Sequence, residues 1–403
     1  MSVVSAMMAK NVENGSMIRR MFELGNQLKA KYGAERVCDF SLGNPDLAPP
    51  KAVQTAMYDL AGTLDRPASL GYMSNGGFAW ALDKLAAWLS VQQGIALTRV
   101  DVMLSVGAAG AMNAFLHSVL EPGDEVLGVA PYFVEYGFYT GNHGGVFKAV
   151  NCRPGDFGLD LDALAAALNP KTRAVIINSP NNPTGTIYPE EDLRGLCALL
   201  EDASARFGRP VYLVSDEPYR FLAYDGAVVP AVLPLYKYAV LISSFSKNYG
   251  LAGERIGYVA LSPAIEDKEL LMNALTLSNR TLGYVNPPIV GQYLMAAALG
   301  TDTSPALEIY TRRRDMLADI LTEAGASFVK PKGAFYFFPK APGGNDAVLV
   351  DCLTEELVLA VPGAGFGYPG HIRLSFAVED AVIERSREGF KRGYANAAEK
   401  LGL

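Results

Sequence analysis

Residues 243–258 are Ser243-Ser244-Phe245-Ser246-Lys247-Asn248-Tyr249-Gly250-Leu251-Ala252-Gly253-Glu254-Arg255-Ile256-Gly257-Tyr258, directly after the apolar run 239–242. The stretch places serine hydroxyls, one lysine and one arginine where a strand is expected to end. A lysine that is partly desolvated there has its neutral amine form favoured, as Schiff-base chemistry requires. Ser244, Ser246 and Arg255 can bind a phosphate dianion through charge-assisted hydrogen bonds. Taken alone, the stretch is equally compatible with a solvated lysine in a serine-rich loop.

Four other short apolar runs also end abruptly at polar or small residues. They cover 102–106, 125–130, 174–177 and 211–214. Near-continuous apolar runs suit strands that are covered on both faces, as in a mostly parallel sheet. Helical patterns at 111–120 and 190–205 lie between some of these runs. We therefore predict a large α/β/α domain with a mostly parallel sheet over residues 50–290.

The pattern changes after Pro287-Pro288. Helical stretches cover 289–299 and 306–321, strand-like runs cover 333–338 and 371–376, and a final helix covers 379–401. We predict a smaller α+β domain over residues 291–403, which the N-terminal segment 1–49 joins. A length of 403 residues with 50% hydrophobic content agrees with two packed regions.

Residues at the carboxyl ends of the strands are expected to line one cleft, because ligands bind there in open α/β sheets. Gly107-Ala108-Ala109 follows a strand and begins a helix, so its backbone N–H groups can approach an anion. Asp216 ends another strand and can stabilise a protonated ring nitrogen. Asn182 lies in an Asn-Pro turn and can reach a phenolate oxygen. A tight turn, a cap and turn chemistry are the alternatives when each feature is taken alone.

Taken together, these motifs resemble the class I aminotransferase family, which has fold type I among pyridoxal-phosphate enzymes. They recur in order over nearly the whole chain, and the stretch around Lys247 is similar to the family's cofactor-lysine motif. The resemblance implies an α/β fold of type I with pyridoxal 5′-phosphate bound as a Schiff base on Lys247. It also implies a transaminase that moves an amino group between an L-amino acid and a 2-oxo acid, with an aspartate or glutamate type among the options.

The resemblance assigns roles to individual residues. Lys247 carries the cofactor and moves the proton, Asp216 pairs with the pyridine nitrogen, and Tyr219 contacts the 3-oxygen. These three are the expected catalytic residues. The other residues expected around the cofactor are Gly107, Ala108, Ala109, Phe133, Asn182, Ser244, Ser246 and Arg255.

Substrate and partner contacts follow from the same resemblance. Arg373 matches the arginine that binds the substrate α-carboxylate, and Gly43 matches the glycine beside that carboxylate; Asn182 also belongs to the expected substrate site. Tyr72 matches a tyrosine that reaches the phosphate of the neighbouring subunit. The resemblance thus implies a homodimer whose active sites are shared across the interface.

The chain departs from the family where side-chain specificity is decided. Ala109 stands where some members that prefer dicarboxylates carry a lysine. Other members use an arginine of the partner subunit shortly before an Asn-Pro-Pro sequence. Before Asn286, the ungapped match to that arginine is Thr281, and Arg280 lies one residue away. Arg280 is therefore a candidate for binding a distal carboxylate, with a surface ion pair as the alternative.

Composition limits the partners and the location. Lys and Arg total 35 against 42 Asp and Glu, and a net charge of −7 argues against nucleic-acid binding. The four cysteines are widely spaced and the three histidines lack metal-ligand spacing, so we predict no metal site. Because no apolar run reaches about 18 residues, we predict no membrane span and expect a cytoplasmic protein.

Two other functions stay open at this point. A pyridoxal-phosphate lyase that breaks a Cβ–S bond or catalyses an elimination can use Lys247, Asp216 and Arg373 equally well. Such an enzyme releases thiol or ammonia without an amine acceptor, whereas a transaminase needs the acceptor. A non-enzymatic regulator that binds pyridoxal phosphate is the other alternative; such proteins usually carry a DNA-binding domain, which the acidic composition disfavours.

Overall fold

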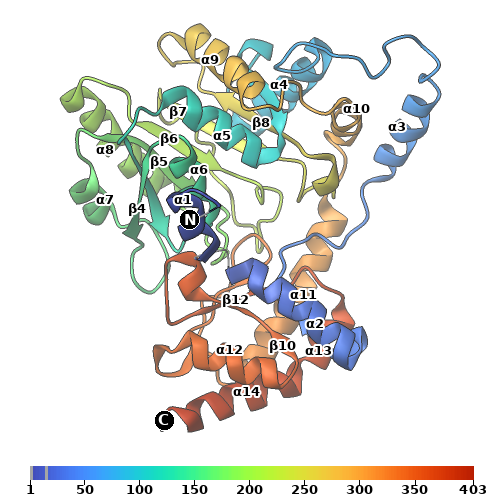
Figure 1. Ribbon diagram of the computed structural model, residues 1–403, viewed down its shortest axis with the longest axis vertical. Helices are drawn as coiled ribbons and strands as arrows, with labels where there is room; N and C mark the ends of the chain where they lie inside the picture. The colour runs from blue at the N-terminus through green and yellow to red at the C-terminus, as the bar shows by residue number, and fades with distance from the viewer. Residues whose placement is uncertain (1–2, 14–16) are drawn as a thin grey trace.

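The computed structural model describes residues 3–13 and 17–403. The upper part of the molecule in Figure 1 is a large sheet between helices. The lower part brings N-terminal and C-terminal segments, coloured blue and red, side by side (Figure 1). An α/β fold with a large, mostly parallel sheet and a smaller α+β part is therefore confirmed, whereas the boundaries at 49/50 and 290/291 stay predictions.

The large sheet has seven strands, and all of its neighbouring pairs are parallel except those that β8 makes. In spatial order the strands are β2 (Val102–Val106), β8 (Ile256–Leu261), β7 (Ala239–Ser244), β6 (Tyr212–Asp216), β5 (Thr172–Asn178), β3 (Glu125–Ala130) and β4 (Val146–Asn151). The residues of β3, β6, β7 and β8 are all buried, as expected for strands covered on both faces.

The continuous apolar runs in the sequence predict five of these strands and miss β4 and β8. β4 lies at the edge of the sheet and most of its residues are not buried, so its sequence carries no continuous apolar run. β8 begins inside the stretch 243–258 around Lys247, where the polar residues before it hide the start of an apolar run. Its Gly257 packs directly on the backbone of Gly107, where a Cβ atom would collide.

Helices cover both faces of the sheet and extend beyond it (Figure 1). They are α3 (Lys51–Ala61), α4 (Ala79–Gln93), α5 (Gly107–Val119), α6 (Glu135–Asn142), α7 (Leu161–Ala167), α8 (Glu190–Phe207), α9 (Lys268–Thr281) and α10 (Ile289–Ala298). Single 3₁₀ turns occur at Ala34–Arg36, Arg99–Asp101, Ala252–Glu254, Pro342–Gly344 and Gly363–Phe366. α5 begins at Gly107, as the Gly107-Ala108-Ala109 sequence predicts, so Ala108 and Ala109 lie in its first turn.

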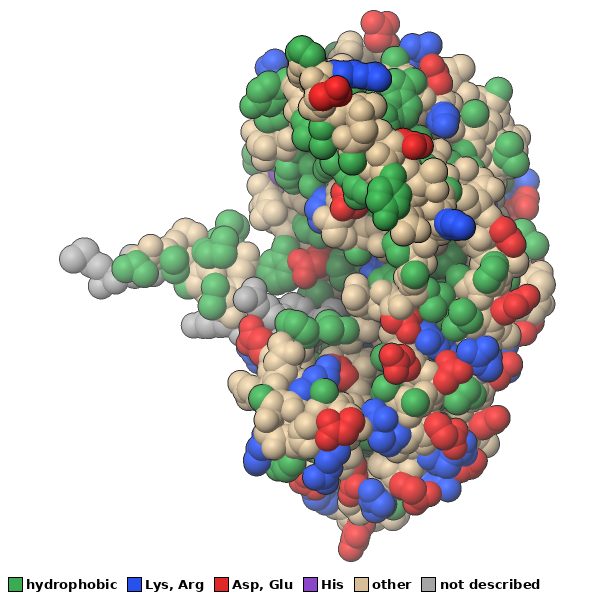
Figure 2. Space-filling model, turned by 90° about the vertical axis from the view of Figure 1, so that its right-hand side faces the viewer, with side chains coloured by type: hydrophobic (Ala, Val, Ile, Leu, Met, Phe, Trp, Pro, Cys, Tyr) green, Lys and Arg blue, Asp and Glu red, His purple; other side chains and the backbone are tan. Residues whose placement is uncertain are grey.

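The lower part joins both ends of the chain. Its elements are α2 (Met17–Tyr32), β1 (Cys38–Asp39), α11 (Ser304–Glu323), β9 (Tyr336–Phe337), α12 (Asp346–Glu355), β10 (Val358–Leu359), β11 (Val361–Pro362), β12 (Ile372–Ser375), α13 (Asp380–Arg385) and α14 (Arg387–Lys400). The first helix, α1 (Ala6–Glu13), projects from the body (Figure 2). β1 pairs with β10 in parallel, and β12 lies between β11 and β9. The expected strand 333–338 is only two residues long, and the expected helix 379–401 is divided at Ser386, whose hydroxyl donates to the Ile383 carbonyl oxygen at 2.6 Å.

The described residues also bear on the predictions from composition. All four cysteines are buried and unpaired. None of the helices within 3–13 and 17–403 combines the length and the apolar character that crossing a bilayer requires.

A buried arginine ties α11 to the large sheet domain. Arg314 is only 1% exposed and donates from Nη1 and Nη2 to the carboxylate of Asp225, at 2.7 and 2.9 Å. Its guanidinium also lies 4.6 Å from the centre of the Tyr224 ring and donates to the Pro331 carbonyl oxygen. Because the Arg314 side chain is buried on several sides, its removal leaves both unfilled volume and unpaired acceptors.

Replacing this residue should measurably weaken the fold. Arg314→Ala is expected to lower the free energy of unfolding by about 2–3 kcal/mol, measured by urea unfolding. The matched control is Arg206→Ala, because Arg206 forms an exposed pair with Asp202 at 3.0 Å on α8. That control should change the free energy by less than about 1 kcal/mol. Equal midpoints for the two variants would contradict a structural role for Arg314.

Candidate active site

A cavity of about 370 Å³ lies at the carboxyl ends of the parallel strands. β5 ends at Asn178, β6 at Asp216 and β7 at Ser244, and all three side chains line it. The remaining lining residues are Gly43, Ala108, Ala109, Met112, Phe133, Tyr136, Tyr139, Asn182, Pro218, Tyr219, Ser246, Lys247, Ala252, Arg255, Tyr336 and Arg373. The cavity therefore draws on the N-terminal segment, the large sheet and the C-terminal part.

Asp216 is a buried carboxylate that lacks a partner on one oxygen. The Tyr136 hydroxyl donates to Oδ2 at 2.6 Å, whereas Oδ1 has no hydrogen-bond partner among the described residues. Burial raises the pKa of Asp216 to about 7; the Tyr136 hydrogen bond opposes this rise and the nearby Glu217 adds to it. Buried polar atoms are normally paired, so Oδ1 fits a ligand that offers a protonated nitrogen.

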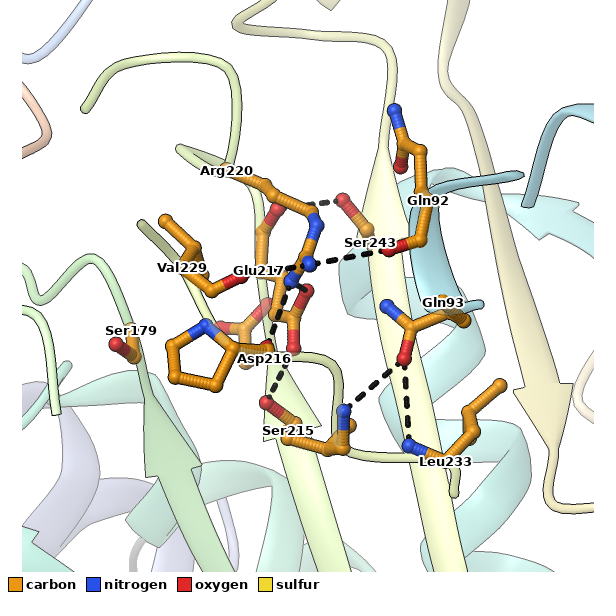
Figure 3. Close-up of polar contacts among 12 residues, drawn as sticks. Gln92, Gln93, Ser179, Ser215, Asp216, Glu217, Arg220, Val229, Leu233 and Ser243 are labelled. Atoms are coloured by element: carbon orange, nitrogen blue, oxygen red, sulfur yellow. Dashed lines mark hydrogen bonds and ion pairs between the residues drawn. The ribbon is translucent and has the colours of Figure 1, made fainter. Parts of the chain in front are cut away.

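A second acidic residue supports the strand end from behind. Figure 3 shows Glu217 among Ser215, Ser243 and Arg220. Arg220 Nη1 and the Ser215 hydroxyl both donate to the Glu217 carboxylate at 2.8 Å, and the Ser243 hydroxyl donates to the Glu217 carbonyl oxygen at 2.9 Å. These bonds hold the chain after β6 against β7 and so fix the position from which Asp216 projects.

Lys247 follows β7 and lines the cavity. Its Nζ donates to the Gly43 carbonyl oxygen at 2.5 Å. Burial, together with the positive charges of Arg373 and Arg255, lowers the pKa of Lys247 to about 8. A neutral amine is therefore accessible near physiological pH, which suits a nucleophile or a base.

Arg373 projects from β12 and is only 2% exposed. It donates from Nη2 to the Ser41 carbonyl oxygen at 2.5 Å and from Nη1 to the Asn182 side-chain oxygen at 3.3 Å. Both acceptors are neutral, and Nε has no partner among the described residues. Burial lowers the pKa of Arg373, because desolvation disfavours its charge. A buried guanidinium with neutral partners fits an anionic ligand such as a carboxylate.

Another part of the cavity lining contains groups that attract a phosphate. Val106 precedes α5 without a side-chain cap, so the first N–H groups of the helix remain available near Ala108 and Ala109. Gly107 has φ of 68°, and a Cβ atom there would lie 2.5 Å from Arg255 Nη2, so only glycine allows this approach. Arg255 thus lies beside the positive end of α5, with Ser244 and Ser246 lining the same cavity.

The structure brings most of the predicted site residues together. Twelve of them line the cavity: Gly43, Ala108, Ala109, Phe133, Asn182, Asp216, Tyr219, Ser244, Ser246, Lys247, Arg255 and Arg373. Gly107 is buried next to it and supports it. Tyr72, which is 94% exposed, and Arg280, exposed in the last turn of α9, do not line the cavity of this chain. Their predicted roles both require a second subunit.

Several lining residues were not predicted. Tyr136 lies in the first turn of α6, three residues after Phe133, and its backbone N–H donates to the Phe133 carbonyl oxygen at 3.1 Å. Tyr336 places its hydroxyl 2.8 Å from that of Tyr219, and a side chain at Gly43 would collide with it. Asn178 donates to the Asp216 carbonyl oxygen at 2.8 Å and accepts from the Asn182 backbone N–H at 2.6 Å. It therefore positions both neighbours.

Comparisons with known proteins agree with this geometry. A family model described as aminotransferase class I and II matches residues 35–390. The aspartate/prephenate aminotransferase of Thermus thermophilus is 31% identical over 361 residues, which are 87% of this chain and 89% of the relative. A solved amino transferase from Eubacterium rectale has a TM-score of 0.93 and 36% identity, covering 98% of this chain and all of its own. The Thermus thermophilus aspartate aminotransferase with maleate has a TM-score of 0.86 at 28% identity, with coverage of 98% and 100%.

The environment of Lys247 predicts an unusually reactive amine. In the protein after removal of bound ligands, labelling of Lys247 by acetic anhydride should rise with pH through a midpoint near 8, because the amine is neutral above its pKa. Peptide mapping measures the fraction of Lys247 that is labelled, and labelling of the exposed Lys51 serves as the reference for the reactivity of the reagent. Arg373→Met should move the midpoint upward, because it removes a positive charge. A midpoint near the ordinary lysine value of 10.5 would contradict the lowered pKa.

Proposed function

This chain belongs to the class I and II aminotransferase family and is a transaminase, and we propose that it moves the amino group of an L-amino acid to a 2-oxo acid with pyridoxal 5′-phosphate held on Lys247. The observation that carries the proposal is the unpartnered Asp216 Oδ1 in the same cavity as Lys247 and the phosphate-attracting end of α5. A protonated pyridine nitrogen, an aldehyde carbon and a phosphate are the three features of one molecule that these groups fit.

Different residues of the cavity would bind different parts of the cofactor. Ser244, Ser246 and Arg255 would bind the phosphate together with the N–H groups of α5, and Phe133 would pack against the ring. Tyr219 and Asn182 would contact its 3-oxygen. When bound, pyridoxal phosphate supplies the electron sink for negative charge formed at the substrate Cα. Asp216 would keep the ring nitrogen protonated, since its carboxylate is more favourable beside a positive charge than alone in a buried site.

Arg373 is the proposed anchor for the substrate. A bidentate pair between its guanidinium and the α-carboxylate would supply the charge that the neutral Ser41 and Asn182 acceptors do not. A side chain at Gly43 would collide with the Tyr336 hydroxyl, so the glycine lets Tyr336 lie against the backbone in the cavity that the carboxylate would enter. With the carboxylate held, the substrate Cα lies in the cavity that Lys247 lines, and orientation of this kind lowers the barrier to proton transfer.

Lys247 is the proposed base. The Lys247 amine, when it is not bonded to the cofactor, would take the proton from the substrate Cα and deliver it to the cofactor carbon that had carried the aldehyde. Its lowered pKa keeps the amine able to accept a proton near neutral pH. Family membership favours transamination over a lyase or a non-enzymatic regulator, and a requirement for a 2-oxo acid acceptor distinguishes the transaminase from the lyase.

We propose a homodimer with shared active sites. Tyr72 is 94% exposed, as a residue that reaches a neighbouring subunit's phosphate should be. Figure 2 shows the N-terminal helix projecting from the body, and its Met7, Met8 and Val12 side chains are 52%, 45% and 70% exposed. Apolar surface of this kind is typically covered by a partner. The cytoplasmic location stays a prediction.

For the substrate we propose an aspartate or glutamate type. Two of the relatives named above, both from Thermus thermophilus, carry aspartate in their names, and the name of the solved one adds maleate, a dicarboxylate. Within one chain the cationic side chains that line the cavity are Lys247, Arg255 and Arg373, and each already has a proposed role. A distal carboxylate therefore needs a cation from elsewhere, and the exposed Arg280 of the second subunit is the candidate.

Borohydride reduction tests the cofactor proposal. Reduction of the purified enzyme should fix the cofactor irreversibly on Lys247, and peptide mapping should find the label on that residue alone. Lys247→Arg should carry no label and should lower kcat by about 10²–10⁴-fold or more, because the base is lost with the covalent bond. Lys84→Arg, at an exposed lysine of α4, is the matched control and should behave as wild type. A label on another lysine would overturn the assignment.

Arg280→Ala tests the substrate type. Losing an arginine–carboxylate pair costs roughly 2–5 kcal/mol, so kcat/KM for aspartate should fall about 30-fold or more, with little change for alanine. Arg194→Ala, at an exposed arginine on α8, is the control. Equal losses for both substrates would indicate a structural role, and no loss would make the enzyme one for neutral or aromatic amino acids.

Mixed dimers test the shared site separately. If Arg280 acts across the interface, a dimer of Lys247→Ala and Arg280→Ala subunits has one site with both residues intact. About half of randomly mixed dimers contain one subunit of each variant, and each of these has one intact site of its two. Refolding the two variants together should therefore restore about one quarter of wild-type aspartate activity. Activity no higher than that of the unmixed variants would show that Arg280 does not act across the interface.

A further inference from the structure

Two of the three histidines meet away from the cofactor cavity. His117 lies in the last turn of α5, and His143 caps the C-terminal end of α6. Their Nδ1 atoms are 3.2 Å apart, although 26 residues separate them in the sequence. The two rings are tilted by 59° with centroids 5.0 Å apart, so they converge at their Nδ1 edges and do not stack.

Asn113 determines which nitrogen of His143 carries a proton. Its side-chain NH₂ donates to the Ala109 carbonyl oxygen at 2.9 Å, which orients the amide. The amide oxygen then faces His143 Nε2 at 3.1 Å and can only accept a hydrogen bond. His143 therefore carries its proton on Nε2, and the lone pair of Nδ1 points at His117. Histidine ligands of metals are commonly oriented by a second hydrogen bond of this type.

The spacing of the two Nδ1 atoms suits one metal ion. Imidazole nitrogen binds zinc at about 2.0–2.1 Å, and two nitrogens 3.2 Å apart then subtend about 100° at the ion, near the tetrahedral angle. Without an ion, the two atoms can share only a single proton.

The surroundings leave room for an ion and its water ligands. The pair borders an open hollow of about 710 Å³, lined also by Asn142, Leu282 and Tyr284. The lining residues among those described include no lysine or arginine that would repel a cation. No cluster of three or more His, Cys, Asp or Glu side chains occurs in residues 3–13 and 17–403, so water would complete the coordination.

We propose that His117 and His143 form a binding site for one divalent transition-metal ion, of the kind that imidazole ligands prefer: zinc, copper or nickel. The ion takes the place of the shared proton, and the neutral His117 ring then carries its proton on Nε2. The ion joins the C-terminal ends of α5 and α6. Both helices also contribute residues to the cofactor cavity, among them Ala109 of α5 and Tyr136 of α6. Metal binding therefore stabilises the arrangement of these two helices.

Calorimetric titration with Zn²⁺ tests the proposal on the holoenzyme, purified without a polyhistidine tag. We expect one saturable site per protomer and a higher Tm in the presence of Zn²⁺. His117→Gln and His143→Gln should each abolish both effects. His371→Gln is the matched control, because His371 stacks on Phe338 elsewhere in the molecule, with ring centroids 5.1 Å apart. Absence of saturable binding, or binding that persists in both variants, would overturn the proposal.

The electron paramagnetic resonance spectrum of added Cu²⁺ gives a second measurement that needs only wild-type protein. Coupling to two imidazole nitrogens at one equivalent of Cu²⁺ supports the pair. Coupling to a single nitrogen, or to none, would show an adventitious ion only, and the pair would then be a hydrogen bond between two histidines.

Discussion

The cavity at the carboxyl ends of the strands depends on burying ionisable groups against neutral partners. Asp216 receives a hydrogen bond from the Tyr136 hydroxyl, and Arg373 donates to a carbonyl and an amide oxygen. Neither contact neutralises the buried charge, and burying a charge without an opposite one is costly. The pKa directions express this cost, since that of Asp216 is raised and that of Arg373 is lowered. A ligand with a cationic nitrogen and a carboxylate relieves both.

The fold holds these groups in place with segments that are distant in the sequence. The Phe40 carbonyl oxygen accepts from the Ser375 N–H at 2.8 Å, which fastens the N-terminal segment to β12. Gly43 and Arg373 are thereby brought into the cavity, where Lys247 after β7 donates to the Gly43 carbonyl oxygen, and the end of β6 supplies Asp216. Glu217 and Arg220 supply the rigid support behind Asp216 (Figure 3). Such preorganisation is what allows fixed charges to act on a reacting group.

Much of this arrangement could be predicted because it is encoded locally. The buried strands appear as continuous apolar runs, and the polar residue at each run's end marks the edge of the sheet. The stretch around Lys247 combines the lysine, the serines and Arg255 within a few residues. β4 escaped prediction because an edge strand exposes most of its residues, and the helix over 379–401 was predicted as continuous because a serine break leaves no strong signal.

The sequence by itself therefore determined the α/β class, the strand ends and the grouping of Lys247 with the serines and Arg255 that line one cavity, since each depends on periodicity or on residues close together in the chain. Only the tertiary structure decided that Tyr136 bonds Asp216, that Tyr336 meets Tyr219, and that His117 meets His143. It also decided that Arg373 has only neutral partners. These facts depend on strand register, helix packing and the meeting of both chain ends, and hydrogen bonds between residues tens to hundreds of positions apart leave no local pattern to detect.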